Sequence, residues 1–391
     1  MKIGLVAGEA SGDLLGAGLI RALRARVPDA TFEGVAGCAM VDAGCSQWED
    51  SEALAVMGLV EPLREIPRLL MLRRSLVRRW RASPPDVFVG IDAPDFNFGL
   101  EKKLRRSGIR TVHYVSPSIW AWRAGRIKTV RKAADRVLCI LPFEKAIYDR
   151  HGIDAVFVGH PKADSLPTDI DTDAARQLLN LEGHRVVTVM PGSRSSEVSR
   201  LGPLFASAAS ILADADDNVR FITPAASPKL RLMIDKQLGF AGVAERFTVT
   251  DGGSIEAMAA ADVVLLASGT AALESALLGK PMVAAYCVAK TTAWIFRTLK
   301  LLKTEYLTLP NLLTETPLVP EFVQEAATPE ALAREVAALL GDTARREAIA
   351  SQFATLRSDL ALGADDRAAA AVIDLVKQRE RPALKRVPAG P

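Results

Sequence analysis

The sequence predicts an α/β fold of two doubly wound domains that face each other across a central cleft. In both halves of the chain, short apolar runs alternate with longer segments of helical periodicity. The runs are continuously apolar, which is typical of parallel strands covered by helices on both faces. A polar, acidic stretch at 161–173 contains prolines and separates the two series, and 391 residues suffice for two such domains.

Each series contains several predicted strands. In the first series they are KIGLVAG, TFEGVAG, DVFVGID, RTVHYV, RVLCIL and AVFVGH. In the second series they are RVVTVM, NVRFITP, RFTVTD, DVVLLAS and KPMVAAY. Helical segments lie between these runs, so each series predicts repeated βα units in a parallel sheet.

Helical patterns continue beyond the last strand, at 328–340, 343–358 and 365–378. The tail RPALKRVPAGP lacks periodicity and is expected to be disordered. The predicted organisation is therefore an N-terminal domain, a C-terminal domain, C-terminal helices and a disordered tail, over 1–165, 166–340, 341–378 and 379–391.

Composition narrows the class of protein. The formal net charge of +3 is too mild for a general nucleic-acid-binding protein. The four cysteines form no CxxC pair and the four histidines no HExxH pair, so neither a metal site nor a disulfide framework is expected. The N-terminus lacks a signal-peptide pattern, and no run approaches the roughly 18 apolar residues of a membrane span. We expect a cytoplasmic protein, soluble or peripheral to a membrane, without a cofactor.

Ligands of parallel sheets bind at the carboxyl ends of the strands, and the candidate motifs lie at such ends. The first motif is GEASGD, between the first strand and the first helix. Its glycines permit a tight turn, and the amides at the helix start can hold a phosphate or a sugar. Its spacing is not GxGxxG. The candidates are Glu9, Ser11, Gly12 and Asp13, although Asp13 can instead be only an N-cap.

The second motif, GIDAPDFN, follows the apolar strand DVFVG. Asp92 ends this strand, where its carboxylate can take a proton from an acceptor hydroxyl, so it is the candidate general base. Asp95 follows Pro94 and is expected to cap the next helix. A structural role for both carboxylates is the alternative.

The third motif, HYVSPSIWAWR, places two tryptophans in a loop with serines and a proline. Trp120 is expected to line an acyl or sugar pocket, with Arg123 adding positive charge nearby. The alternative is a packed aromatic corner beneath a solvated basic helix.

Two loops of small residues open helices in the second half of the chain, PGSRSSE and ASGTAALE. Amides at a helix start bind a diphosphate, and Arg194 adds the fixed cation that a metal supplies elsewhere. Glu274 can accept from ribose hydroxyls or only complement the helix dipole, and Asn311 can contact the base or a phosphate. The predicted nucleotide site is made up of Gly192, Ser193, Arg194, Ser268, Gly269, Thr270, Ala271, Glu274 and Asn311.

Residues 54–81 mix apolar side chains with seven arginines. One interpretation is a helix that faces the core and whose arginines are solvated. The other is a basic amphipathic surface that docks on anionic lipid. The membrane contacts expected in that case are Leu69, Met71, Leu72, Arg73, Arg78 and Arg79, with Trp80 also entering the acyl boundary.

Eight strings occur in order between residues 6 and 313: VAGEASGD, GIDAPDFN, HYVSPSIWAWR, LPFE, FVGH, PGSR, LLASGTAALE and LPNLL. Together they resemble the lipid-A-disaccharide synthases, the glycosyltransferases of lipid A assembly. The resemblance implies the GT-B architecture of two Rossmann-like domains, with the acceptor site in the first and the UDP-sugar site in the second. It implies transfer of 2,3-diacylglucosamine from UDP to 2,3-diacylglucosamine 1-phosphate, with inversion, to give a β-1,6-linked disaccharide 1-phosphate and UDP.

The resemblance also assigns roles to residues and partners. It implies Asp92 as general base, Arg194 as diphosphate contact, and Glu274 and Asn311 near the nucleotide. It implies a protein peripheral on the inner membrane and a homodimer with exchanged C-terminal segments. The alternative for these C-terminal helices is that they cross back and pack on their own chain.

Two other functions remain open from the residues alone. A UDP-sugar 2-epimerase would use a similar fold and similar loops, but its chemistry needs more acid and base groups than these loops carry. A non-catalytic protein that binds a nucleotide or a lipid would not need Asp92. A nicotinamide oxidoreductase is disfavoured, because neither half shows GxGxxG with an acidic residue about 20 positions on.

Overall fold

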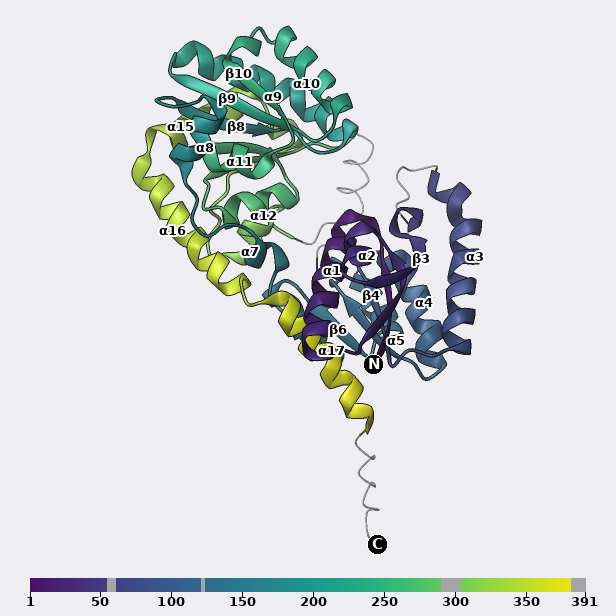
Figure 1. The fold of residues 1–391 in the computed structure, drawn as a ribbon. Coiled ribbons are helices and arrows are strands. Elements are labelled where there is room, and N and C mark those ends of the chain that lie inside the picture. Colours follow the sequence, from purple (N-terminus) through teal and green to yellow (C-terminus); the bar gives the residue numbers. More distant parts are fainter. Residues whose placement is uncertain (55–60, 121–123, 290–303, 381–391) are drawn as a thin grey trace. The chain divides into compact units, whose positions relative to one another are not determined.

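The computed structural model describes residues 1–54, 61–120, 124–289 and 304–380. The chain divides into two compact units, which are coloured along the sequence in Figure 1. Unit 1 comprises Met1–Asp164 and Leu360–Pro391, and unit 2 comprises Ser165–Asp359. Each unit is built around one parallel sheet, so the prediction of two doubly wound α/β domains is confirmed.

In the described residues, the sheet of unit 1 has seven parallel strands in the order β3-β2-β1-β4-β5-β6-β7. Their bounds are β1 Lys2–Ala7, β2 Thr31–Ala36, β3 Cys45–Asp50, β4 Val87–Ile91, β5 Arg110–Tyr114, β6 Arg136–Cys139 and β7 Ala155–Phe157. The helices are α1 Glu9–Arg26, α2 Cys38–Asp42, α3 Glu61–Ala82, α4 Pro94–Arg106, α5 Ile127–Ala133, α6 Pro142–Asp149, α7 Pro161–Ser165 and α17 Ala364–Glu380.

Alternate side chains of the central strands enter two separate apolar layers of unit 1. On one face, Val87 and Val89 of β4 pack with α1 and α17. On the other face, Phe88 packs with α3 and α4. Both faces of β4 are therefore covered, which explains why this strand reads as a continuous apolar run.

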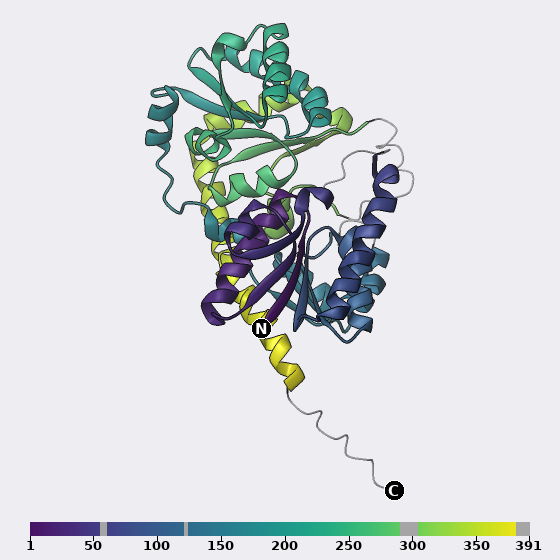
Figure 2. The ribbon, with the colours of Figure 1, turned by 45° about the vertical axis from the view of Figure 1, so that its right-hand side comes forward.

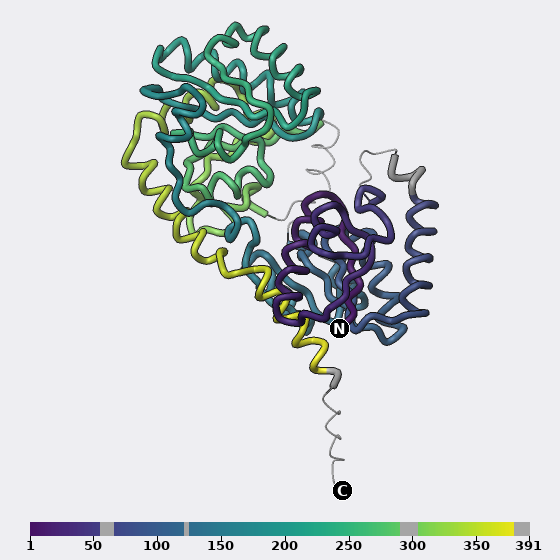
Figure 3. The backbone as a smooth tube through the Cα atoms, viewed as in Figure 1, coloured from purple at the N-terminus to yellow at the C-terminus, as the bar shows by residue number. Residues whose placement is uncertain are grey.

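The end of the chain returns to unit 1, where α17 packs along α1 (Figures 1 and 3). The carboxylate of Asp164 accepts hydrogen bonds from the backbone N–H groups of Gly363 (2.9 Å) and Ala364 (2.7 Å). This carboxylate satisfies orphan amides at the start of α17 and fastens the helix to the end of the first chain segment.

The sheet of unit 2 has six described strands, all parallel, in the order β10-β9-β8-β11-β12-β13. Figure 2 shows unit 2, in teal and green, from a second side. Their bounds are β8 Arg185–Met190, β9 Val219–Ala225, β10 Phe247–Asp251, β11 Val263–Ala267, β12 Met282–Tyr286 and β13 Glu321–Val323. The helices are α8 Thr172–Leu179, α9 Ser195–Ala215, α10 Pro228–Phe240, α11 Ser254–Ala260, α12 Thr270–Leu277, α14 Leu309–Leu313, α15 Pro329–Gly341 and α16 Thr343–Leu360.

Two edge strands, β3 and β13, were not predicted. The sequence of β3, CSQWED, is mostly polar and largely exposed, and β13 has only three residues. Neither contains the apolar run that marks a covered strand, because an edge strand need not be buried on both faces.

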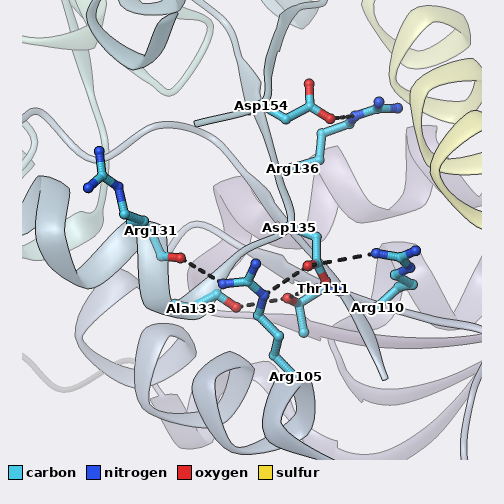
Figure 4. A network of polar contacts seen from close by, with 8 residues as sticks. All are labelled: Arg105, Arg110, Thr111, Arg131, Ala133, Asp135, Arg136 and Asp154. Carbon is cyan, nitrogen blue, oxygen red and sulfur yellow. Dashed lines mark hydrogen bonds and ion pairs between the residues drawn. The ribbon is translucent and has the colours of Figure 1, made fainter. Parts of the chain in front are cut away.

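A polar network joins α4, β5, β6 and α5 near the amino ends of the strands (Figure 4). The Asp135 carboxylate accepts from Arg105 Nε at 2.8 Å and from the backbone N–H of Thr111 at 3.0 Å. Arg136 Nε donates to Asp154 at 2.8 Å. Because ligands of parallel sheets bind at the other end of the strands, this network is a structural one.

No helix in the described part of the chain is long and apolar enough to span a membrane.

Candidate functional site

Three turns of unit 1 lie at the carboxyl ends of neighbouring strands. They follow β1 at Gly8, β4 at Asp92 and β5 at Val115, and β4 pairs with both β1 and β5. A Cβ atom on Gly8 would lie only 2.9 Å from the Cβ of Ala93. The first two turns therefore approach each other so closely that residue 8 has no room for a side chain. The strand order changes direction between β1 and β4, and this switch point is where doubly wound sheets bind their ligands.

Backbone strain is concentrated at the same three turns. Six non-glycine residues of the described chain have positive φ, and four of them lie at these turns: Glu9 (63°), Asp92 (49°), Ala93 (42°) and Val115 (76°). Such conformations cost on the order of 1–3 kcal/mol each and persist where the surrounding structure enforces them. Their gathering at one edge of the sheet supports a functional site there.

Asp92 is held by its backbone, while its side chain is only partly buried. Its N–H donates to the carbonyl of Tyr114 at 2.8 Å, which ties the turn after β4 to the end of β5. The exposed Asp95 forms an ion pair with Arg126. Of the two carboxylates, Asp92 is therefore the one that the strained turn presents.

The first turn of α1 divides the four predicted residues into two pairs. Glu9 and Ser11 are exposed, and Gly12 and Asp13 are buried. Asp13 accepts hydrogen bonds from the N–H groups of Gly37 (2.7 Å), Ala39 (2.8 Å) and Met40 (3.1 Å). The carboxylate of Asp13, which lies within α1, thus caps the start of a different helix, α2, and its hydrogen bonds are made to the backbone there.

The loop after β5 is anchored to α6. Trp120 Nε1 donates to Glu144 Oε1 at 3.2 Å, and the ring of Trp120 meets Phe143 edge-on at 5.3 Å. Ser116 Oγ and Tyr148 Oη lie 2.8 Å apart. Burial raises the pKa of Glu144 to about 7. The predicted partner of Trp120, Arg123, lies outside the described residues.

Sequence reasoning did not identify Glu144 as part of this site. The available signal was its position in LPFE, where a glutamate at the third residue of a helix reaches back to the helix start. Its carboxylate does accept from the backbone N–H of Leu141 at 3.2 Å.

A cavity of about 390 Å³ opens in unit 2 at the carboxyl ends of β8 and β11. The strand order reverses between these two strands, so the cavity lies at the switch point of the second sheet. Its size is typical of small-ligand sites. It brings together all but one of the residues predicted for the nucleotide, namely Gly192, Ser193, Arg194, Ser268, Gly269, Thr270, Ala271 and Glu274.

The carboxylate of Glu197 is bound by the backbone amides and the guanidinium of the loop that follows β8. Its Oε2 accepts from the N–H groups of Ser193 (3.0 Å) and Arg194 (3.2 Å), and its Oε1 lies 3.2 Å from Arg194 Nη1. The carboxylate stands where a phosphate would use the same two amides and the same guanidinium. The same contact forms the capping box of α9, and it brings two amides and a guanidinium together on one carboxylate.

Asn311, the remaining predicted residue, does not line the cavity. Its buried amide donates to Val319 O and Glu321 Oε1, each at 2.8 Å, and accepts from the N–H groups of Leu318 and Val319, each at 2.8 Å. All four hydrogen bonds available to an asparagine amide are made. The structure therefore uses Asn311 to fasten α14 to the segment before β13, and a nucleotide contact would require breaking one of these bonds.

The basic helix α3 has an inner and an outer surface. Trp80 is fully buried and donates to Glu33 Oε1 at 3.1 Å, so the expectation that it enters a membrane is wrong. Leu69 and Leu72 also pack partly against the core. We call the exposed residues Ile66, Leu70, Met71, Arg74 and Arg78 the α3 outer surface.

Two further arginines of α3 interact with aromatic rings of unit 1. The guanidinium of Arg73 lies 4.9 Å from the ring of Phe96, and burial lowers the pKa of Arg73. The guanidinium of Arg79 lies 4.3 Å from the ring of Trp48. These contacts hold both side chains on the protein, so of the three predicted arginines Arg78 is the one that points outward without such a ring contact in the described residues.

Among the described residues, no group of three or more His, Cys, Asp or Glu side chains is arranged to hold a metal ion.

Comparison with known proteins gives a family and a fold. A family model described as lipid-A-disaccharide synthetase matches residues 3–372. The lipid-A-disaccharide synthase of Alkalilimnicola ehrlichii is 49% identical over 376 residues, covering 95% of this chain and 98% of that protein. The enzyme of the same name from Chromohalobacter salexigens is 48% identical over 377 residues, covering 96% and 97%.

Solved structures resemble the fold at much lower identity. A complex of Staphylococcus aureus MnaA with UDP superposes with a TM-score of 0.63 at 12% identity, covering all of both chains. A putative UDP-N-acetylglucosamine 2-epimerase from Listeria monocytogenes gives 0.63 at 14% identity, covering 97% and 96%. A glycosyltransferase from Rickettsia africae gives 0.59 at 11% identity, covering 98% and 99%. At these identities the likeness concerns the fold alone.

Proposed function

Because this chain belongs to the lipid-A-disaccharide synthase family, a family of hexosyltransferases, we propose that its two units bind the two substrates of one glycosyl transfer. Unit 2 holds UDP-2,3-diacylglucosamine, the donor. Unit 1 holds 2,3-diacylglucosamine 1-phosphate, the acceptor. An epimerase remains only a distant relative in fold.

The observation that carries this proposal is the pair of sites at the two switch points. In unit 2 a cavity of about 390 Å³ collects two loops with helix-start amides and Arg194. In unit 1 a strained turn presents Asp92 at the end of β4. One site suits the leaving diphosphate, and the other supplies a base.

In unit 2, the diphosphate of UDP takes the place of the Glu197 carboxylate on the amides of Ser193 and Arg194. The guanidinium of Arg194 then balances the negative charge that grows on UDP as the sugar leaves. Glu274 lines the same cavity, one turn into α12, where its carboxylate accepts from the ribose hydroxyls.

In unit 1, Asp92 accepts the proton of the acceptor's 6-hydroxyl as the oxygen attacks the anomeric carbon of the donor. One base and one leaving group give a single displacement, so the new bond is β. Glu9 and Ser11 are exposed on the first turn of α1, and Trp120 is held by Glu144. We propose that these three residues contact the acceptor sugar and its chains.

Release of UDP tests the proposal. Purified protein with UDP-2,3-diacylglucosamine should release UDP only when the acylated glucosamine 1-phosphate is added, and mass spectrometry should detect a disaccharide 1-phosphate. Equal release without acceptor would instead favour epimerase-like activation of the donor.

We propose further that the α3 outer surface docks on the anionic inner surface of the membrane, where both acylated substrates reside. Met71 is 61% exposed and Leu70 40% exposed, beside the exposed Arg74 and Arg78. Apolar side chains that enter the acyl boundary beside arginines at the headgroups are typical of interfacial helices.

Replacing Leu70, Met71, Arg74 and Arg78 together with Ser should weaken binding to vesicles that contain anionic phospholipid by on the order of 10–100-fold, since each surface arginine contributes about 1 kcal/mol. A matched variant in which Ser replaces the exposed Lys229 and Lys236 of α10 should bind like the unaltered protein. Co-sedimentation measures both. If the α3 variant binds the vesicles as well as the unaltered protein does, the α3 outer surface is a solvated surface and not a membrane contact.

A further inference from the structure

We propose that Asn97 is a positioning residue, which holds the Asp92–Ala93 turn in its left-handed conformation and acts on the reaction through Asp92. The proposal rests on the role proposed for Asp92 as the base. Asn97 lies in the first turn of α4, its side chain is fully buried, and it need not touch either substrate.

The side-chain amide of Asn97 donates to the carbonyls that end two strands. Its Nδ2 lies 2.9 Å from Asp92 O, 3.3 Å from Ile91 O and 3.3 Å from Val6 O. These carbonyls belong to the end of β4 and to β1 beside it. One amide group therefore ties the central strands together at the point where the turn begins.

The backbone of Asn97 holds the other side of the turn. Its N–H donates to Ala93 O at 2.9 Å. Asp92 and Ala93 both have positive φ, a conformation that costs on the order of 1–3 kcal/mol for each residue and needs support from its surroundings. Without the Asn97 amide, buried carbonyls would lose a donor, and the turn could relax towards an ordinary conformation.

The close packing of α4 against β4 and β5 keeps this amide beside the turn. A Cβ atom on Gly90 would lie 3.0 Å from Asn97 Cβ and 2.2 Å from Glu101 Oε1, so β4 approaches α4 closely only because residue 90 is glycine. Glu101, one helical turn after Asn97, lies 2.7 Å from His113 Nδ1 of β5 in a fully buried pair. Burial raises the pKa of Glu101. Asn97 and Glu101 thus join one face of α4 to the strands that flank the turn.

The arrangement is not the one that stability alone would select. Most of the side chains that α3 and α4 pack against this face of the sheet are apolar, and a buried amide is unfavourable unless its hydrogen bonds are made. Asn97 Oδ1 is buried without a hydrogen-bond partner in the described residues. Only the NH₂ group of the amide makes hydrogen bonds in the described residues, and its shortest bond is to the carbonyl of Asp92 in the turn.

The test replaces Asn97 with Leu, which has a similar shape and no amide. The expected result is a loss of about 10–100-fold in kcat, because small misplacements of a catalytic group have effects of this size. The affinity for UDP should be unchanged, and the KM for the acceptor should change much less than kcat. As a control, Thr111→Val removes another buried polar group from the same sheet, at the start of β5, and should keep kcat at temperatures where it is folded.

A double-mutant cycle separates positioning from general destabilisation. If Asn97 acts through Asp92, then adding Asn97→Leu to Asp92→Asn should cause no further loss of kcat. A full additional loss in that background, or normal kcat in folded Asn97→Leu protein, would overturn the proposal. If Asn97→Leu does not fold, Asn97→Ser keeps a short donor and provides the same comparison.

The outcomes also separate this proposal from the one on which it rests. Normal turnover in Asp92→Asn would remove Asp92 as base whatever Asn97 does. Loss of turnover in Asp92→Asn with normal turnover in folded Asn97→Leu and Asn97→Ser would remove only the positioning role.

Discussion

Replacing Asp92 with Asn is expected to lower turnover by about 10²–10⁴-fold, the usual contribution of a positioned general base. Asparagine keeps the shape of the side chain and the bond from its N–H to Tyr114 O, but it cannot accept the proton of the acceptor hydroxyl. UDP should bind with unchanged affinity, because the site proposed for it is made of unit 2 residues. Steady-state turnover and calorimetric titration with UDP measure the two quantities.

Asp95→Asn is the matched control for this change. Asp95 lies three residues further on, is exposed, and pairs with Arg126. The same chemical change there should leave turnover within a few-fold of normal, because an exposed ion pair contributes little. Normal turnover in Asp92→Asn, or an equal loss in Asp95→Asn, would contradict the assignment of the base.

Replacing Arg194 with Ala should weaken UDP binding by on the order of 10–100-fold, the value of a charge-assisted hydrogen bond to a diphosphate. Turnover should fall further, by about 10²–10³-fold, because the guanidinium balances charge that is greatest as UDP leaves. The protein should still fold, since the side chain of Arg194 is 65% exposed and its ion pair with Glu197 is a surface one.

The control for Arg194 comes from the opposite end of the adjoining strand. Arg185 begins β8 and pairs with Asp216 at 3.0 Å, with its side chain 53% exposed. Arg185→Ala removes an equal charge from unit 2 away from the cavity, and UDP affinity should not change. Near-normal UDP affinity and rate in Arg194→Ala would exclude the diphosphate role.

The turns that form the two sites could be predicted because their signals are local. Gly192 to Arg194 and Ser268 to Ala271 are small residues that follow an apolar run and open a helix, and the structure brings both loops to one cavity. Asp92 follows an apolar strand in the same way. Such patterns need only a few neighbouring residues, and strand ends in a parallel sheet share one edge.

The hydrogen-bond partners of several side chains could not be predicted because they are distant in the chain. Asp13 bonds to amides from Gly37 to Met40, and Asn311 bonds to residues beyond the end of its own helix. Both resemble ligand contacts in the sequence, since a polar residue near a strand end has the same appearance whether it faces a ligand or the backbone. Trp80 was misjudged for the same reason, because only the fold shows that Gly4 makes room for its ring.

The anomeric configuration of the product tests the central claim most directly, that a single base in unit 1 and a single leaving group in unit 2 act in one displacement. The protein would be given UDP-2,3-diacylglucosamine and the acylated glucosamine 1-phosphate, and the new glycosidic bond would be assigned by NMR. The account predicts a β-linked disaccharide 1-phosphate, inverted relative to the donor. An α-linked product would require a covalent intermediate or a second displacement, and it would contradict the account.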